Sequence, residues 1–114
     1  MLLGRVIGTV WATRKDESLE GLRLLVVEEV AVDLPPKGGT LIAVDSVQAG
    51  VGELVLVARG SSARQTRVTK DRPVDAVIMA SVDNLELQTD EELEATYGRQ
   101  LAAVRERLAR VEER

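Results

Sequence analysis

The residues best placed to do chemistry lie where an apolar run ends, in the small polar turn GSSAR at residues 60–64. Ser61 and Ser62 are the candidate nucleophiles, but a serine hydroxyl is inert until a neighbouring base takes its proton. The chain contains no histidine and no cysteine, which removes imidazole bases, thiol catalysis and disulfides. Lys70 follows the serines, but its spacing does not match the Ser-x-x-Lys start of a catalytic helix. We therefore predict no catalytic residue and no enzyme activity.

Phosphate and metal ions are the next ligands that such a turn could hold. A phosphate loop brings several backbone N–H groups and a helix N-terminus to one anion. The residues after Ser62 show no helical periodicity and no Gly-Lys-Ser/Thr element. Composition excludes zinc sites of the Cys/His type, and no group of Asp and Glu residues has the spacing of a calcium loop. We expect neither a metal site nor a cofactor.

Basic side chains around the turn point to a third ligand, single-stranded nucleic acid. They are Arg59, Arg64, Arg67, Lys70 and Arg72. Surfaces for single strands also need exposed aromatic rings for base stacking. Trp11 and Tyr97 are the only aromatic residues, and the net charge of the chain is −4. The commoner explanation is pairing with acids of this chain or of a neighbour, such as Asp71, Asp75 or Glu53. We expect no nucleic-acid partner, and an OB-like nucleic-acid-binding module stays the alternative.

The elements that must position this turn are predicted to be short strands. Runs rich in Val, Leu and Ile occupy residues 2–12, 22–32, 40–47, 54–59 and 74–83. Gly4 and Gly8 inside the first run indicate bends or close backbone approach, as at the corner of a barrel. Two prolines and two glycines at 33–39 predict a turn, because they cannot continue a strand ladder. The pattern predicts a mostly β fold, a small five-stranded, OB-like closed barrel over residues 1–88.

Residues 89–114 depart from the strand pattern and are predicted to form a C-terminal amphipathic α-helix. Thr89 is the expected N-cap, with acidic residues at 90–92 in the first turn. The apolar residues recur every three or four positions, at Leu93, Tyr97, Leu101, Val104, Leu108 and Val111. We favour packing of this stripe against the chain's own or an adjacent barrel. A five-helix bundle and a docking helix for another protein are the alternatives.

Composition also bears on assembly and location. With one Trp, one Tyr and no Phe, the core must be built from Val, Leu, Ile and Ala, which bury less area than aromatic side chains. A small barrel with such a core is expected to gain burial from further copies of itself. The start MLLGRVIGTV is interrupted by Arg5 and lacks a signal-peptide cleavage site, and no apolar run reaches the roughly 20 residues of a membrane span. We expect a cytoplasmic protein without a membrane partner.

Three stretches of the predicted barrel resemble a known family in their order and spacing. They are GRVIGTVWATRKDESLEGLRLLVV, AVDSVQAGVGELVLVARGSSARQ and RPVDAVIMASVD. They resemble the pentameric vertex proteins of bacterial microcompartments, the family of the carboxysome vertex protein and its ethanolamine-utilisation relative. The middle stretch is the most specific of the three. The resemblance covers residues 1–88 and does not extend into the tail.

This resemblance implies a five-stranded barrel that assembles as a homo-pentamer at the vertices of a polyhedral shell in the bacterial cytoplasm. The flat faces of such shells consist of unrelated hexameric shell proteins, which would be its partners. A flat hexagonal lattice cannot close, so five-fold units supply the curvature. The implied function is structural, without catalysis. The C-terminal helix departs from the family pattern, and docking of a shell protein or of encapsulated cargo is one role considered for it.

The resemblance gives a second interpretation of the turn after residue 59. Small residues are what a ring needs where five backbones crowd about an axis. We therefore predict that the turn approaches the five-fold axis and borders a narrow pore. The pore-lining candidates are Gly60, Ser61, Ser62 and Ala63. Arg64 is expected to pair across the subunit seam. Arg72 and Asp75, on either side of Pro73, are expected to fix the last strand at the same interface.

Overall fold

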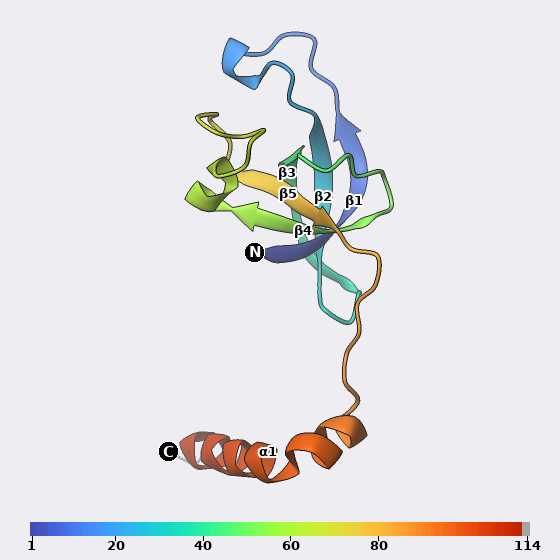
Figure 1. Ribbon diagram of the computed structural model, residues 1–114, viewed down its shortest axis with the longest axis vertical. Helices are drawn as coiled ribbons and strands as arrows, with labels where there is room; N and C mark the ends of the chain where they lie inside the picture. Colours follow the sequence, from blue (N-terminus) through green and yellow to red (C-terminus); the bar gives the residue numbers. More distant parts are fainter. Residues whose placement is uncertain (113–114) are drawn as a thin grey trace. The chain divides into compact units, whose positions relative to one another are not determined.

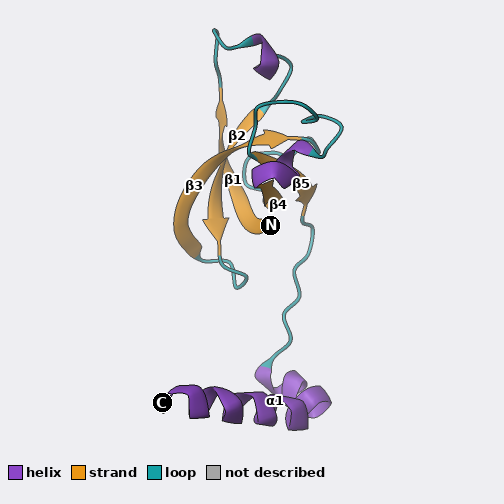
Figure 2. Ribbon diagram, turned by 90° about the vertical axis from the view of Figure 1, so that its left-hand side faces the viewer, coloured by secondary structure: helices purple, strands orange, loops and turns teal. Residues whose placement is uncertain are grey.

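Five short strands, each with buried aliphatic side chains, close into a barrel in the computed structural model, which describes residues 1–112 (Figures 1 and 2). The strands are β1 (Leu2–Val10), β2 (Leu24–Val30), β3 (Pro36–Asp45), β4 (Leu54–Arg59) and β5 (Ala76–Ser81). They form one closed sheet in the order β1-β2-β3-β5-β4. Two 3-10 helices, η1 (Glu17–Leu19) and η2 (Gly60–Arg64), lie in the connections. The predicted five-stranded barrel is confirmed.

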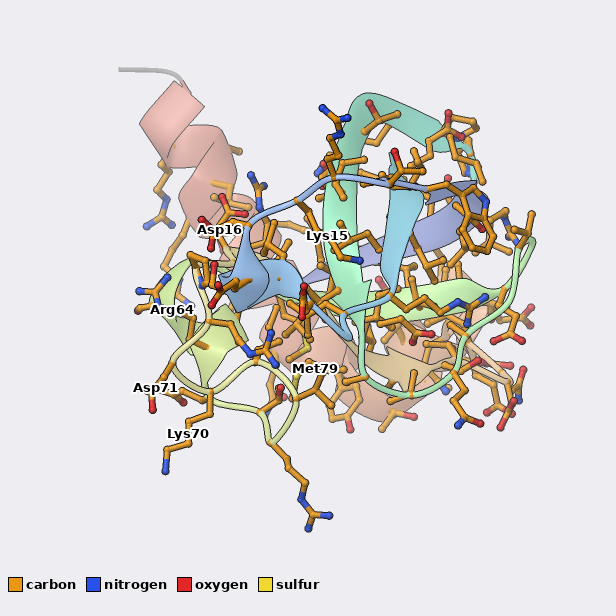
Figure 3. The ribbon with its side chains drawn as sticks, turned by 90° about the horizontal axis from the view of Figure 1, so that it is seen from above. Lys15, Asp16, Arg64, Lys70, Asp71 and Met79 are labelled. Carbon is orange, nitrogen blue, oxygen red and sulfur yellow. The ribbon has the colours of Figure 1, made fainter. Side chains whose placement is uncertain are left out.

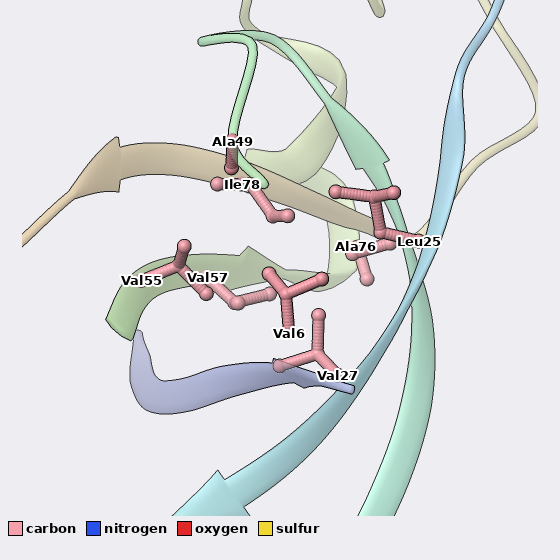
Figure 4. Packing of buried hydrophobic residues seen from close by; sticks show 9 residues of the cluster. Val6, Leu25, Val27, Ala49, Val55, Val57, Ala76 and Ile78 are labelled. Atoms are coloured by element: carbon pink, nitrogen blue, oxygen red, sulfur yellow. The ribbon is translucent and has the colours of Figure 1, made fainter. Parts of the chain in front are cut away.

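The interior of the barrel is filled by a cluster of aliphatic side chains (Figure 4). Its buried members are Val6, Leu25, Val27, Ala43, Ala49, Val55, Val57, Ala76 and Ile78. The strand pairs are antiparallel except for β3 and β5, which run parallel. A Cβ at Gly4 would overlap Val27 Cγ1. Gly4 therefore permits the close approach of β1 to β2 that the sequence predicted.

A second apolar cluster lies on the outer side of the sheet. Its buried members are Leu22, Val44, Ala58, Ala63 and Val77. Val77 lies between Ala76 and Ile78 of the interior cluster, so strand alternation points Val77 outward. Because Ala63 belongs to η2 and Leu19 of η1 packs against the cluster, these contacts hold both 3-10 helices on the barrel.

The third strand is longer than predicted, so the predicted turn at 33–39 is wrong in its second half. β3 begins at Pro36, which pairs with Val30 of β2. Proline is tolerated at the first residue of a strand, where its missing N–H costs no ladder bond. The reversal occupies residues 31–35. Leu34 there has a φ of 83°, and its N–H donates to the Ala31 carbonyl at 2.8 Å.

The chain divides into two compact units, Met1–Asn84 and Leu85–Arg114, and the second contains α1 (Asp90–Glu112). Thr89 Oγ1 accepts a hydrogen bond from Glu92 N–H at 3.1 Å, and Glu92 Oε2 accepts one from Thr89 N–H at 3.2 Å. This capping box confirms Thr89 as the N-cap. Tyr97 leaves helical geometry, with φ −126° and ψ 16°, so α1 consists of two helical pieces.

The apolar stripe of α1 is largely exposed where its side chains are described. Tyr97, Val104 and Leu108 have exposed side chains, and Leu93 is half-buried. The side chains of Leu101 and Val111 lie outside the described part of the structure. What packs on this stripe therefore stays a prediction. Among the described residues, no helix is long and apolar enough to cross a membrane.

Candidate functional site

The turn GSSAR forms η2, a 3-10 helix that directly follows β4. Gly60 begins it with φ +68°, a left-handed conformation that favours glycine, and its N–H donates to the Asp75 carbonyl at 2.8 Å. The side chains of Ser61 and Ser62 are exposed. Ala63 differs, because its side chain is fully buried in the outer cluster. The turn therefore exposes two hydroxyl side chains, while Ala63 anchors it on the barrel of the same chain.

Two threonines hold the turn in place through hydrogen bonds. No sequence pattern singled them out. Thr69 is fully buried, and its hydroxyl donates to the Ala63 carbonyl. Thr66 Oγ1 lies 2.6 Å from Thr69 Oγ1 and accepts from Thr69 N–H at 3.0 Å. The spacing Thr-x-x-Thr in a polar loop is the signal that would have found them, because such hydroxyls satisfy nearby backbone groups. The loop that follows η2 is therefore ordered by its own hydrogen bonds.

The arginines predicted at the interface have backbone partners within the chain. Arg64 Nη1 donates to the Val74 carbonyl at 3.3 Å, and the Arg64 side chain is exposed. Arg72 Nη1 donates to the carbonyls of Ser18 and Glu20 at 2.7 and 2.9 Å. Arg72 therefore ties the loop after η2 to the segment around η1.

The basic side chains near η2 form no ion pair within residues 1–112. The ion pairs there are Arg23–Asp45, Lys37–Glu29, Arg105–Glu94 and Arg110–Glu106. Asp75 is exposed, and Glu53 accepts a hydrogen bond from Ser81 Oγ at 2.7 Å. The side chains of Lys70 and Asp71 point outward from the loop after η2 (Figure 3). Among residues 1–112 no acid of the same chain forms an ion pair with this basic group, and pairing with a neighbour stays a prediction.

An ion pair between the buried Asp45 carboxylate and the half-exposed Arg23 side chain fixes the connection between β3 and β4. The Asp45 side chain is 2% exposed, and its Oδ2 lies 2.9 Å from Arg23 Nη1. Asp45 Oδ1 accepts from the N–H groups of Val47 and Ala49, each at 3.1 Å. A buried carboxylate is tolerated when donors satisfy it in this way. Its role is structural, and the described residues contain no group of three His, Cys, Asp or Glu side chains that could hold a metal ion.

Comparison with known proteins identifies the barrel. The model of the family described as ethanolamine utilisation protein EutN/carboxysome matches residues 1–83. The bacterial microcompartment shell vertex protein GrpN of Rhodospirillum rubrum is 49% identical over 86 residues, which cover 75% of this chain and 97% of that relative. The shell vertex protein PduN of Salmonella typhimurium is 47% identical over 89 residues, with coverage of 75% and 98%.

A solved structure shows the same arrangement of the chain. The GrpN pentameric microcompartment shell protein from Rhodospirillum rubrum matches with a TM-score of 0.69 at 48% identity, over 76% of this chain and 100% of that chain. The alternative of a nucleic-acid-binding module finds no support in these relatives. The family match ends at residue 83, before α1 begins. The chain belongs to the EutN/CcmL family of ethanolamine utilisation and carboxysome proteins.

Proposed function

We propose that this protein is a structural vertex protein of a bacterial microcompartment shell, located in that shell within the bacterial cytoplasm and assembled as a homo-pentamer. The observation that carries the proposal is the match to a pentameric shell protein, 48% identical and covered over its whole chain. The absence of histidine and cysteine from the sequence agrees with a structural role. The proposed function requires neither a cofactor nor a membrane.

A five-fold unit closes a lattice that six-fold units cannot close alone. Hexameric shell proteins tile a plane, and a plane encloses no volume. Pentamers at the vertices introduce the curvature that a closed polyhedral shell needs. The expected partners are therefore hexameric shell proteins, each meeting an edge of the ring. A rigid barrel suits this role, and the two apolar clusters of the first unit supply that rigidity.

The pore of the proposed ring is bordered by η2. Gly60, Ser61 and Ser62 are exposed and small, so five copies of this turn fit around an axis without a clash of bulky side chains. Ala63 supports the turn from within its own barrel rather than facing the opening. The Thr69 hydrogen bond to the Ala63 carbonyl holds the turn in place. Serine hydroxyls at the opening offer water and anions weak polar contacts.

The seam of the proposed ring includes charged residues of η2 and of the loop after it. Arg64 and Asp75 are exposed, and we place them in charge pairs across the seam. Arg72 contributes to the seam indirectly, because its two hydrogen bonds hold the segment around η1 in place. Charge reversal at Arg64 or at Asp75 is expected to lower the mass of the ring in sedimentation, whereas reversal of the exposed Arg107 in α1 leaves it unchanged. An unchanged mass in the first two variants rejects this seam and leaves the ring itself in place.

Native mass spectrometry of the purified chain tests the assembly. The proposal expects five subunits at micromolar concentration, and a well-behaved single subunit would overturn it. Co-expression with a hexameric shell protein tests the role in closure by electron microscopy. Closed polyhedra are expected with this chain, and open sheets or tubes without it. Docking of a shell protein or of cargo by α1 is the finer part of the proposal, and a pull-down with the separate tail tests it.

A further inference from the structure

The bend in α1 lies at Tyr97 and Gly98, between a short N-terminal piece and a longer C-terminal piece. Tyr97 has φ −126° and ψ 16°, and the helix changes direction in this region (Figure 2). The sequence of α1 contains no proline, which is the commonest cause of a kink. It contains one glycine, Gly98, and glycine is among the residues that weaken a helix most. The helix is therefore weakest where it bends.

An ion pair joins the two pieces of α1 across the bend. Arg105 Nη1 lies 2.5 Å from Glu94 Oε1, although the two residues are 11 apart in sequence. In a straight helix the side chains that meet are three or four residues apart. Residues 11 apart are separated by about 16 Å along the axis of a straight helix. The Glu94–Arg105 pair therefore forms only while α1 is bent, whereas the Arg110–Glu106 pair has i,i+4 spacing and lies within one piece.

Gly98 makes room for the Glu94 carboxylate at the bend. A Cβ at Gly98 would lie 3.3 Å from Glu94 Oε2, which is tighter than most contacts that a Cβ makes. The other oxygen of the same carboxylate, Oε1, accepts the hydrogen bond from Arg105. Glycine thus both loosens the helix and lets the carboxylate lie close to the backbone. We call Glu94, Gly98 and Arg105 the latch.

The ion pair of the latch is weak enough to open. The side chains of Arg105 and Glu94 are 57% and 49% exposed. Exposed ion pairs contribute little to stability, and salt screens them. Once the pair opens, helical hydrogen bonding can continue through Tyr97, because extending an existing helix is far easier than starting one. The bent and straight forms are therefore close enough in free energy for both to be populated.

Straightening changes the surface that α1 presents. Tyr97, Val104 and Leu108 are exposed apolar side chains. Their spacing of seven and four residues places them on one face of a straight helix, together with Leu93. In the bent form, Leu93 belongs to the piece before the break, and Val104 and Leu108 belong to the piece after it. A helix that binds in a groove needs its apolar anchors on one continuous face, which only the straight form provides.

We propose that α1 is a two-state hinge: the latch holds the bent form, and its release produces a straight helix with one continuous apolar face. The straight form suits the docking proposed for α1, so the latch regulates that docking. The inference rests on the proposed function for this role alone, because the hinge itself depends on contacts within α1. A partner that binds the straight form better shifts the population toward it by its difference in affinity for the two forms.

The distance between two spin labels measures the hinge, because the chain has no cysteine of its own. Labels at Glu91→Cys and Ala109→Cys occupy exposed positions on the two pieces. The labelled full-length chain is diluted with unlabelled chain, so that an assembly of any size holds one pair. A straight helix separates the two Cα atoms by about 27 Å, and the bent form brings them closer.

Both distances are expected at low salt. The longer one should grow at about 1 M salt, where the charges of the latch are screened. A single distance that salt does not change overturns the hinge. That result leaves the vertex function standing, which the native mass tests separately.

Removal of one charge gives a second measurement on the same labelled chain. Arg105→Gln is expected to raise the ratio of straight to bent form about threefold at low salt, and to remove its dependence on salt. Arg110→Gln is the matched control, because it breaks the pair with Glu106 inside one piece and should leave the ratio unchanged. Equal ratios in the two variants overturn the latch.

Exchange of the two charges separates ion pairing from side-chain size. Glu94→Arg alone and Arg105→Glu alone should both straighten α1, whereas the double variant should restore the bent form. Gly98→Ala should favour the straight form about fivefold, with a gain of helix in circular dichroism. A double variant as straight as the single ones, or an unchanged ratio in Gly98→Ala, overturns the inference.

Discussion

A single exposed carboxylate, Asp16, organises the start of η1. Its Oδ1 accepts hydrogen bonds from the Ser18 hydroxyl at 2.6 Å and from the Ser18 N–H at 2.9 Å. These two bonds, the hydroxyl first, hold the pKa of Asp16 below its ordinary value of 3.8. A carboxyl whose pKa is lowered in the folded state stabilises that state above pH 3.8, and the contribution is lost as the pH falls through the lowered pKa.

The pKa of Asp16 can be measured by titrating its carboxyl carbon with NMR. We expect a midpoint below 3.8, and we expect Ser18→Ala to move it back toward 3.8 because the largest stabilising contact is then lost. Ser62→Ala removes an exposed hydroxyl elsewhere and serves as the control that leaves the midpoint unchanged. A midpoint at or above 3.8 in the unaltered chain would show that the Ser18 contacts do not form in solution.

Asp45 is the residue whose loss should cost the barrel most among the charged side chains described. Asp45→Ala leaves the N–H groups of Val47 and Ala49 without their acceptor, while Arg23 Nη1 keeps its hydrogen bond to the Ala49 carbonyl. A buried backbone N–H left without an acceptor costs about 1–3 kcal/mol, so urea unfolding at a fixed protein concentration should show a loss of about 2 kcal/mol. Glu29→Ala breaks the exposed pair with Lys37 at 3.6 Å and should cost less than about 1 kcal/mol. Equal losses in the two variants would contradict this difference.

At the scale of elements, the strands were predictable because their apolar pattern is local. The fourth strand is β4 at its predicted bounds of 54–59, and the others differ only at their ends. Two features were not predictable because they depend on tertiary contacts. β3 already begins at Pro36 because Val30 of β2 is available as its partner. The 3-10 helix η2 is held by the buried Thr69 hydroxyl, which no periodicity in residues 60–64 reveals.

The stability of the first turn of α1 depends on a few hydrogen bonds. Thr89→Ala removes the hydroxyl that accepts a hydrogen bond from Glu92 N–H. The first turn of α1 is therefore expected to lose about 1 kcal/mol of stability and to open more often. Thr89→Ser keeps an acceptor at the same place and should retain most of the protection. Hydrogen exchange at the amides of residues 91–93 provides the measurement. If the alanine and serine variants exchange alike, the capping box does not stabilise the helix.

For the whole molecule, the sequence located the candidate site but could not resolve its contacts. Ser61 and Ser62 lie exposed in a short turn, as a pore border requires, whereas Ala63 is taken up by the barrel. Arg72 was predicted for the seam, yet its two hydrogen bonds lie within the chain. Interface partners come from another subunit, so no pattern in one sequence specifies them. The resemblance of the middle stretch, which spans this turn, predicts it as the pore border, whereas residue types alone left several ligands open.

The barrel should assemble without the tail. Every member of both apolar clusters lies at or before Ile78, and the family match ends at residue 83. Removal of residues 89–114 therefore deletes no core side chain, and we expect native mass spectrometry to show five truncated subunits. The unfolding midpoint in urea should also stay unchanged. A single truncated subunit would mean instead that α1 holds the ring together, which the alternative of a five-helix bundle requires. A five-helix bundle of the bent form would have only short continuous helices, because the break at Tyr97 divides α1 into two pieces. Short helices are only marginally stable without packing partners.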